Sequence, residues 1–267
     1  MLRADNPGPM TLDGTRSYVL RAPGAPGCVV VDPGPALEPH LAELAAAGPV
    51  ELVLVTHRHA DHTGGLARFR ELTGAPSRGA LPEFCAAGGA GGTGAGPLAD
   101  GEILDAAGLR IEVLATPGHT ADSVCFVVSA PGDPESGRVV LTGDTVLGRG
   151  TTVLAEPDGS LRDYLASLDR LTALRLPGSC PGLPGHGPVV PDLGAVVGEY
   201  REHRLGRLDQ VRSALSTLGA TLPDAAAPLP ESLLDRVTRT VYTDVDPSVL
   251  GAARSSVRAQ LEYLRGR

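Results

Sequence analysis

Apolar and polar positions along the chain follow two patterns, one typical of buried strands and one typical of helices. Six short runs are rich in Val, Leu and Ile and either alternate or stay apolar throughout, which predicts strands of a buried sheet. They cover residues 17–21, 28–32, 50–55, 109–116, 124–130 and 138–142. A Pro- and Gly-rich turn joins the first two, so we expect the first sheet to begin with this pair.

Segments with helical spacing of apolar residues lie between these strands. Strands and helices in one chain together indicate an α+β fold. Residues 37–47 and 66–73 each end at a glycine, a helix stop signal. Ser160 begins a capping box, and the apolar stripe that follows it predicts a helix packed on the core. His40 lies on the first helix without partners in the pattern, so we expect it at the surface. The Gly-rich stretch 75–101 has no periodicity and predicts a mobile loop.

The last part of the chain predicts three helices, at residues 192–219, 231–242 and 247–265, with a Pro-rich connection before the second. We therefore expect two domains, residues 1–191 and residues 192–267.

A run of potential metal ligands directly follows the apolar segment 50–55. The segment Thr56–Gly65, T-H-R-H-A-D-H-T-G-G, holds four of them: His57, His59, Asp61 and His62. Side chains alternate faces in an extended segment, so His57 and His59 point the same way and can bind one ion. Asp61 and His62 follow where a helix can begin, so they can face a second ion. Surface histidines in a polar turn are the alternative, but that suits one isolated histidine better than four clustered ligands.

This pattern resembles the H-x-H-x-D-H motif of the metallo-β-lactamase superfamily. Three later segments resemble that family's remaining ligand loops in the same order: Thr116–Thr120, Thr142–Thr145 and Pro184–Pro188. The resemblance implies a four-layer αββα sandwich with two metal ions at one edge of the sheets. It also implies a ligand set in which His57, His59 and His119 hold the first ion, Asp61, His62 and His186 hold the second, and Asp144 bridges the two.

Within that family, two regions resemble the β-lactamase-like protein 2 subgroup. The opening segment Asn6–Thr15 is similar, although Arg16 stands where the subgroup usually has Asn. In the tail, Glu199–Arg204 and Thr240–Tyr242 resemble the small winged-helix-like domain that this subgroup carries after its catalytic domain.

Composition limits the partners and the compartment. The net charge is -8, and residues 1–194 hold 13 Arg against 22 Asp and Glu, so the charge gives no general support for nucleic-acid binding. No apolar run approaches the ~20 residues that cross a bilayer, and the N-terminus lacks a hydrophobic signal core, so we expect no membrane contact and a cytoplasmic location. The four cysteines are widely spaced, which predicts reduced, mostly buried thiols.

The resemblance implies a hydrolase mechanism. Two divalent cations about 3.5–4 Å apart can share a water, lower its pKa toward ~7 and so supply a bridging hydroxide as nucleophile. Asp61 would orient that hydroxide. The imidazole and carboxylate ligands suit two Zn²⁺ ions and leave iron or manganese open. Asp32 either supports the ligands by hydrogen bonds from behind or is an ordinary aspartate at a strand end.

Three functions fit these residues. The acidic catalytic part favours hydrolysis of a thioester or carboxylic ester of an intracellular metabolite, as in glyoxalase II-like and acyl-carrier thioesterase relatives. Cleavage of single-stranded RNA is the alternative that the β-lactamase-like protein 2 resemblance allows. Arg201 and Arg204 could reach an anionic substrate in either case, or belong to a solvated, charge-balanced helix face. A metal-stabilised scaffold without activity is the third.

Overall fold

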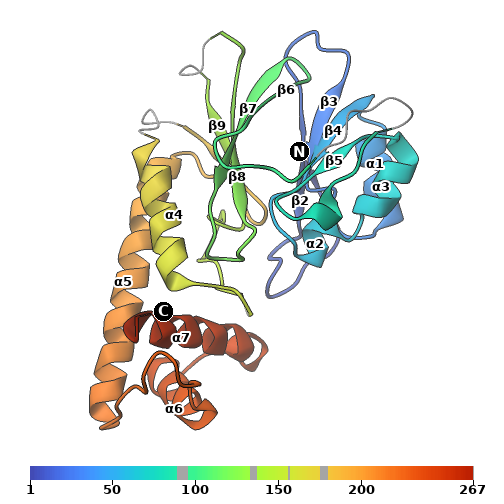
Figure 1. Ribbon diagram of the computed structural model, residues 1–267. Helices are drawn as coiled ribbons and strands as arrows, with labels where there is room; N and C mark the ends of the chain where they lie inside the picture. The colour runs from blue at the N-terminus through green and yellow to red at the C-terminus, as the bar shows by residue number, and fades with distance from the viewer. Residues whose placement is uncertain (89–95, 133–136, 156, 175–179, 267) are drawn as a thin grey trace.

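Two β-sheets lie face to face between layers of helices in the computed structural model of the chain (Figure 1). The structure describes residues 1–88, 96–132, 137–155, 157–174 and 180–266. Within this part of the chain, every helix is too short or too polar to cross a membrane.

The first sheet has the strand order β1-β2-β3-β4-β5. Its strands are β1 (Leu2–Arg3), β2 (Arg16–Leu20), β3 (Cys28–Val31), β4 (Val50–Leu54) and β5 (Ser77–Arg78). The first three strands pair antiparallel, whereas β3, β4 and β5 are parallel. The crossover from β3 to β4 contains helix α1 (Glu38–Ala45), and the one from β4 to β5 contains α2 (Ala60–Thr63) and α3 (Leu66–Thr73).

The second sheet has the order β10-β9-β8-β7-β6. Its strands are β6 (Ile103–Ala106), β7 (Leu109–Ala115), β8 (Val124–Ser129), β9 (Val139–Gly143) and β10 (Gly182–Pro184). The strands β6 to β9 form an antiparallel meander, and β10 adds to β9 in parallel after α4 (Leu161–Ala173).

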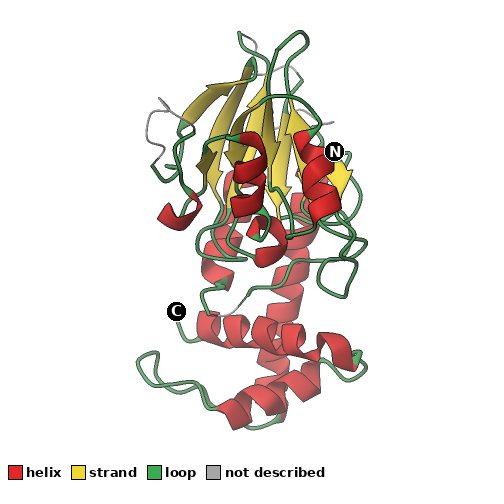
Figure 2. Cartoon of the chain, turned by 90° about the vertical axis from the view of Figure 1, so that its right-hand side faces the viewer, coloured by secondary structure: helices red, strands yellow, loops and turns green. Residues whose placement is uncertain are grey.

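Neighbouring residues on the strands face different layers, which explains why the strands are apolar throughout. Val29 and Val31 of β3 pack with Phe126 of β8 between the two sheets. Cys28 and Val30, on the opposite face of β3, pack against α1 and α3. On the outer face of the second sheet, β8 and β9 pack against α4 and the start of α5 (Leu193–Thr217). Figure 2 shows α1 and α3 in front of the first sheet, so the expected four-layer αββα sandwich is confirmed.

The helices at the end of the chain form a second apolar core. They are α5, α6 (Glu231–Val241), the short helix η2 (Pro247–Val249) and α7 (Leu250–Leu264). Val211, Leu234, Val237, Val257 and Leu261 pack together between them. The described residues of 192–266 contain no strand, so the helical part of the expected tail is present, whereas the wing of a winged helix is not seen.

The stretch 75–101 differs from its prediction as a loop. It contains β5 and the short helix η1 (Pro82–Phe84), and Ser77 pairs with Ala86. The Gly-rich residues 89–95 lie outside the described residues. The described cysteines are free thiols, as expected; Cys28, Cys125 and Cys180 are buried and Cys85 is partly exposed.

Candidate metal centre

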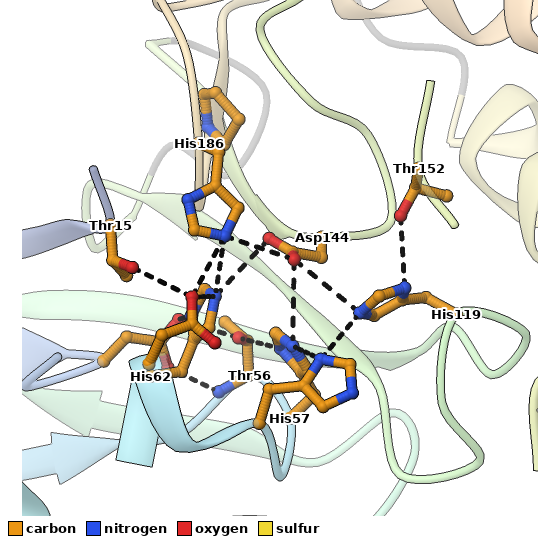
Figure 3. A network of polar contacts seen from close by, with 12 residues as sticks. Thr15, Thr56, His57, His62, His119, Asp144, Thr152 and His186 are labelled. Carbon is orange, nitrogen blue, oxygen red and sulfur yellow. Dashed lines mark hydrogen bonds and ion pairs between the residues drawn. The ribbon is translucent and has the colours of Figure 1, made fainter. Parts of the chain in front are cut away.

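Seven potential ligands converge from four segments of the chain at one edge of the sandwich (Figure 3). The loop after β4 supplies His57 and His59, and the following helix α2 supplies Asp61 and His62. His119, Asp144 and His186 follow β7, β9 and β10. Each ligand loop begins at the end of a hydrogen-bonded strand, so a rigid sheet fixes its starting point.

Four of these residues form a first group. His59 Nδ1 lies 3.0 Å from His57 Nε2 and 3.0 Å from His119 Nε2. Asp144 Oδ2 lies 3.9 Å from His57 Nε2 and 3.6 Å from His119 Nε2. A single proton on His59 Nδ1 can form a hydrogen bond with only one of the two neighbouring nitrogens, His57 Nε2 or His119 Nε2, so the other is left without a donor from His59.

The other three form a second group. Asp61 Oδ2 lies 3.3 Å from His62 Nε2 and 3.2 Å from His186 Nε2, and these two nitrogens are 3.4 Å apart. Asp144 also reaches this group, because its Oδ1 is 3.5 Å from His62 Nε2 and its Oδ2 is 3.4 Å from His186 Nε2. Asp144 therefore lies between the two groups.

Hydrogen bonds on the far side of four rings leave their Nε2 lone pairs directed into the site. In each case Nδ1 faces an oxygen that can accept its proton. These oxygens are Thr56 Oγ1 for His57, Asp32 Oδ2 for His62, Val153 O for His119 and Gly14 O for His186. Thr56 Oγ1 is free to accept because its own proton goes to Asp32 Oδ2.

The electrostatics of the two groups differ. Burial lowers the pKa of His57 well below its usual value and that of His59 to about 4, and neighbouring imidazoles act in the same direction. Burial also acts to lower the pKa of His62 and His186, but Asp144 outweighs it, together with Asp32 for His62 and Asp61 for His186. The pKa of His186 is thereby raised to about 9. The second group therefore favours positive charge.

These atoms fit metal ions. Ligands of a tetrahedral ion with metal–nitrogen bonds of about 2.0–2.1 Å are separated by about 3.3 Å, close to the separations within both groups. Asp144 Oδ1 is buried and accepts no hydrogen bond from the described residues. Buried carboxylate oxygens are costly to leave without a partner, and a bound cation would supply one.

Asp32 supports the site from behind. Its side chain is buried, and its Oδ1 accepts the backbone N–H of Thr56 at 2.8 Å. Its Oδ2 accepts from Thr56 Oγ1 at 2.7 Å and from His62 Nδ1 at 2.8 Å. Of the two interpretations of Asp32, the structure favours the supporting one.

The N-terminal segment supports the second group in a way the sequence did not reveal. Thr15 Oγ1 donates to Asp61 Oδ2 at 2.9 Å, and Asn6 holds Thr15 through its side-chain amide. Arg16, the departure from the subgroup pattern, instead pairs with Asp13, away from the ligands. Only the resemblance of residues 6–15 to a family segment marked this region in advance.

A cavity of about 570 Å³ opens over the two groups, within the size range of small-molecule sites. His59, Asp61, His119, Asp144 and His186 line its floor. The walls come from distant parts of the chain: Met10 and Thr11, Val153 and Ala155, and Ser248, Ala252 and Ser255 beside and on α7. We call this the metal cavity.

The two arginines expected to contact substrate lie elsewhere. Arg204 is buried, donates to the backbone carbonyl of Thr152 and stacks on the ring of Tyr164. Arg204 therefore cannot contact substrate as the sequence predicted, because its guanidinium is enclosed in the protein. Arg201 is exposed and pairs with Asp169 of α4, and neither arginine is among the described residues that line the metal cavity.

The prediction that His40 lies at the surface is wrong. It is buried, not at the surface, and its Nε2 lies 2.9 Å from Ser17 Oγ. Burial lowers its pKa, so the ring is held neutral as a packed core histidine.

The fold and the ligand geometry agree with comparisons to known proteins. Residues 10–177 match the Metallo-beta-lactamase superfamily. The chain is similar to an atrochrysone carboxyl ACP thioesterase of Aspergillus chevalieri, with 32% identity over 92% of this chain and 75% of that protein. It is also similar to a beta-lactamase-like protein 2 homolog of Caenorhabditis elegans, with 30% identity over 97% of this chain and 81% of that protein.

A solved structure extends the similarity through the C-terminal helices. A metallo-beta-lactamase family protein of Thermus thermophilus superposes with a TM-score of 0.72 and 26% identity, over 99% of this chain and 92% of that one. Fold and site thus define a hydrolase with a metal-binding His and Asp cluster. The chain belongs to the metallo-beta-lactamase superfamily.

Proposed function

We propose that the protein is a binuclear metal-dependent hydrolase that cleaves a thioester or carboxylic ester of a small metabolite. The observation that carries the proposal is the position of the two ligand groups, joined by Asp144, at the floor of a cavity of about 570 Å³. The similarity to a carboxyl ACP thioesterase supports the substrate class.

In this proposal, His57, His59 and His119 would hold one ion, Asp61, His62 and His186 would hold the other, and Asp144 would bridge them. The imidazole and carboxylate donors favour zinc, and iron or manganese would suit the same atoms. Two bound metal ions would supply a nucleophile at neutral pH and would stabilise the oxyanion that develops on the attacked carbonyl.

Asp61 is the catalytic residue of the proposal. Burial acts to raise its pKa, but in the metal-free protein hydrogen bonds from His186 and His62 outweigh this and hold the pKa far below its usual value. A bound cation would take the place of those protons and act in the same direction, so the carboxylate stays ionised. Its side chain is 27% exposed, and Thr15 fixes Oδ2, so a carboxylate of known orientation faces the cavity. An ionised carboxylate there can accept a hydrogen bond from the attacking water and orient it.

Cleavage of single-stranded RNA has less support. Phosphate binding requires several cations along the path of the strand, whereas the side chains that line the metal cavity in the described structure include no Lys or Arg. The two tail arginines that could have contacted RNA are not available, because Arg204 is buried and Arg201 pairs with Asp169. A cavity over the ligands likewise favours an enzyme over a metal-stabilised scaffold.

A side-by-side assay of the zinc-loaded protein tests the proposal. We expect turnover of a small acyl thioester that is nearly independent of ionic strength, and no cleavage of a single-stranded oligonucleotide. Oligonucleotide cleavage that falls steeply with salt would favour the RNA hypothesis instead. The scaffold hypothesis predicts turnover of neither substrate.

A further inference from the structure

Arg149 lies outside the lining of the metal cavity, in an adjoining chamber, and is a cation that the hydrolase mechanism does not use. A second chamber of about 230 Å³ adjoins the metal cavity and shares His119 and Asp144 with it. Arg149 lines this side chamber and is exposed. Within the part of the chain that the structure describes, its guanidinium makes no ion pair and no side-chain hydrogen bond.

The backbone of Arg149 is fixed although its side chain is free. Gly148 N donates to His186 O at 2.9 Å, and a Cβ atom on Gly148 would collide with the Pro188 carbonyl. Leu147 N donates to the Tyr200 hydroxyl of α5 at 3.0 Å. The long side chain therefore starts from a defined point five residues after the bridging carboxylate of Asp144.

The rest of the side chamber is mainly apolar. Its other walls include Pro9, Leu12, Leu147, Val153, Val249 and Ala252. A guanidinium above such walls suits a group that combines hydrocarbon with one negative charge, because hydrocarbon gains from burial and Arg forms strong, charge-assisted hydrogen bonds with carboxylates and phosphates.

We propose that Arg149 is a specificity-determining residue that pairs with an anionic group on the substrate, while the apolar walls contact the hydrocarbon beside it. This inference rests on the thioesterase function proposed above and narrows its substrate class to thioesters with a carboxylate or phosphate near the scissile bond. The anion belongs either to the acyl part or to the thiol part, and the experiment separates the two.

Three thioesters of matched size form the test. Pentanoyl-N-acetylcysteamine is neutral, glutaryl-N-acetylcysteamine carries a carboxylate on an acyl chain of equal carbon number, and the pentanoyl thioester of 3-mercaptopropionate carries it on the thiol. We expect the wild type to prefer one anionic probe, and Arg149→Gln to lower the ratio of its kcat/KM to that of the neutral probe about tenfold, chiefly through KM. Arg149→Lys should lower the ratio less, because it keeps the charge.

Arg239→Gln is the matched control. Arg239 is an exposed arginine on α6 that lines neither chamber, so its substitution makes the same change in net charge and should leave the ratio unchanged. An unchanged ratio in Arg149→Gln for both anionic probes would overturn the proposal, as would an equal fall in Arg239→Gln.

Product binding gives a second readout that does not depend on turnover. Calorimetry should show that the wild type binds one product with the extra carboxylate more tightly than its counterpart without it, either glutarate over pentanoate or 3-mercaptopropionate over N-acetylcysteamine, and that Arg149→Gln loses this preference. Absence of any preference in the wild type overturns the role of Arg149. If the preference is present but none of the three thioesters is hydrolysed, the proposed thioesterase function fails while the anion site stands.

Discussion

At the scale of single residues, the orientation of four imidazole rings determines what the site can bind. The Nδ1 atoms of His57, His62, His119 and His186 face oxygens of the protein, so their Nε2 atoms meet in one space. Lone pairs directed at one another repel unless a proton or a cation lies between them. The raised pKa values of His62 and His186 show that protons would occupy this space in the absence of metal.

Metal binding should therefore release protons. His186 has a pKa of about 9, so it is protonated at pH 7.5 in the metal-free protein and must lose that proton to become a ligand. Because its pKa is raised above the unfolded value of ~6.5, its contribution to the stability of the metal-free protein is complete below pH ~6.5 and is lost as the pH rises through 9. Calorimetry of zinc binding in buffers of different ionisation enthalpy should show release of about one proton or more at pH 7.5, decreasing toward pH 10. Zinc binding without proton release would contradict this electrostatic account.

The sequence predicted the ligands better than their surroundings. Clustered His and Asp side chains after a strand are a strong local signal, and the structure brings all seven predicted ligands together. His40 was misjudged because it had no partner in the sequence pattern, and Arg204 because of its charge, although the position of each on its helix was the better guide. His40 is four residues from the buried Leu44, and Arg204 is four residues from both Tyr200 and Leu208, spacing that places them on the buried face of their helices.

At the scale of elements, the site depends on how closely the loop after β10 approaches the loop after β9. Gly185 N donates to Gly143 O at 2.8 Å, and a Cβ atom on Gly185 would lie 2.5 Å from Asp144 Oδ1 and 2.6 Å from His62 Cε1. Glycine is therefore required here by the space that two ligands occupy.

Gly185→Ala should reduce the metal content of the protein because the added methyl group displaces Asp144 or His62. Gly206→Ala is the control, since Gly206 lies exposed in the middle of α5 with open space around its Cβ position. We expect Gly206→Ala to keep full metal content and to gain about 0.5–1 kcal/mol in the free energy of unfolding, as glycine weakens helices. Metal analysis and thermal unfolding of both variants check this, and equal metal content in the two would count against the proposed bridge.

Long periodic elements were predictable from the sequence, and short edge strands were not. Helices α5 and α6 begin and end within two residues of their predicted positions, and Ser160 caps α4 by accepting from Asp163 N, as the capping box predicted. Strands β5, β6 and β10 have two to four residues each and lie in turn-rich sequence. Such strands exist because a neighbouring strand offers hydrogen bonds, which a local pattern cannot show.

At the scale of the whole molecule, α5 joins the sandwich to the C-terminal helices. Leu193, Val197, Tyr200 and Leu208 belong to the core between α4 and the second sheet, whereas Val211 and Leu215 belong to the core of the C-terminal helices. A boundary at residue 191 remains a prediction. Arg204 lies on the part of α5 that belongs to the first of these cores, and it holds the carbonyl of Thr152, whose hydroxyl lies 3.2 Å from His119 Nδ1. The tail therefore supports a ligand loop from behind.

Arg204→Met should destabilise the protein and loosen the loop that orients His119. Losing the charge-assisted hydrogen bond and the aromatic contact should lower the free energy of unfolding by about 2–4 kcal/mol. The zinc content should fall because His119 is held less firmly. Arg201→Met, on the exposed face of the same helix, should have little effect on either quantity. Thermal unfolding and zinc analysis of the pair check this, and identical behaviour of the two variants would contradict the supporting role of Arg204.

If two metal ions joined by Asp144 make this chain a hydrolase, activity must depend on how many ions are bound. A zinc titration of the metal-free protein, with thioester hydrolysis measured at each step, shows this dependence. We expect activity to reach its maximum at two ions per chain in the wild type, and Asp144→Ala to bind less zinc and to stay inactive throughout. Full activity of metal-free protein, or undiminished activity in Asp144→Ala, would rule out the binuclear mechanism.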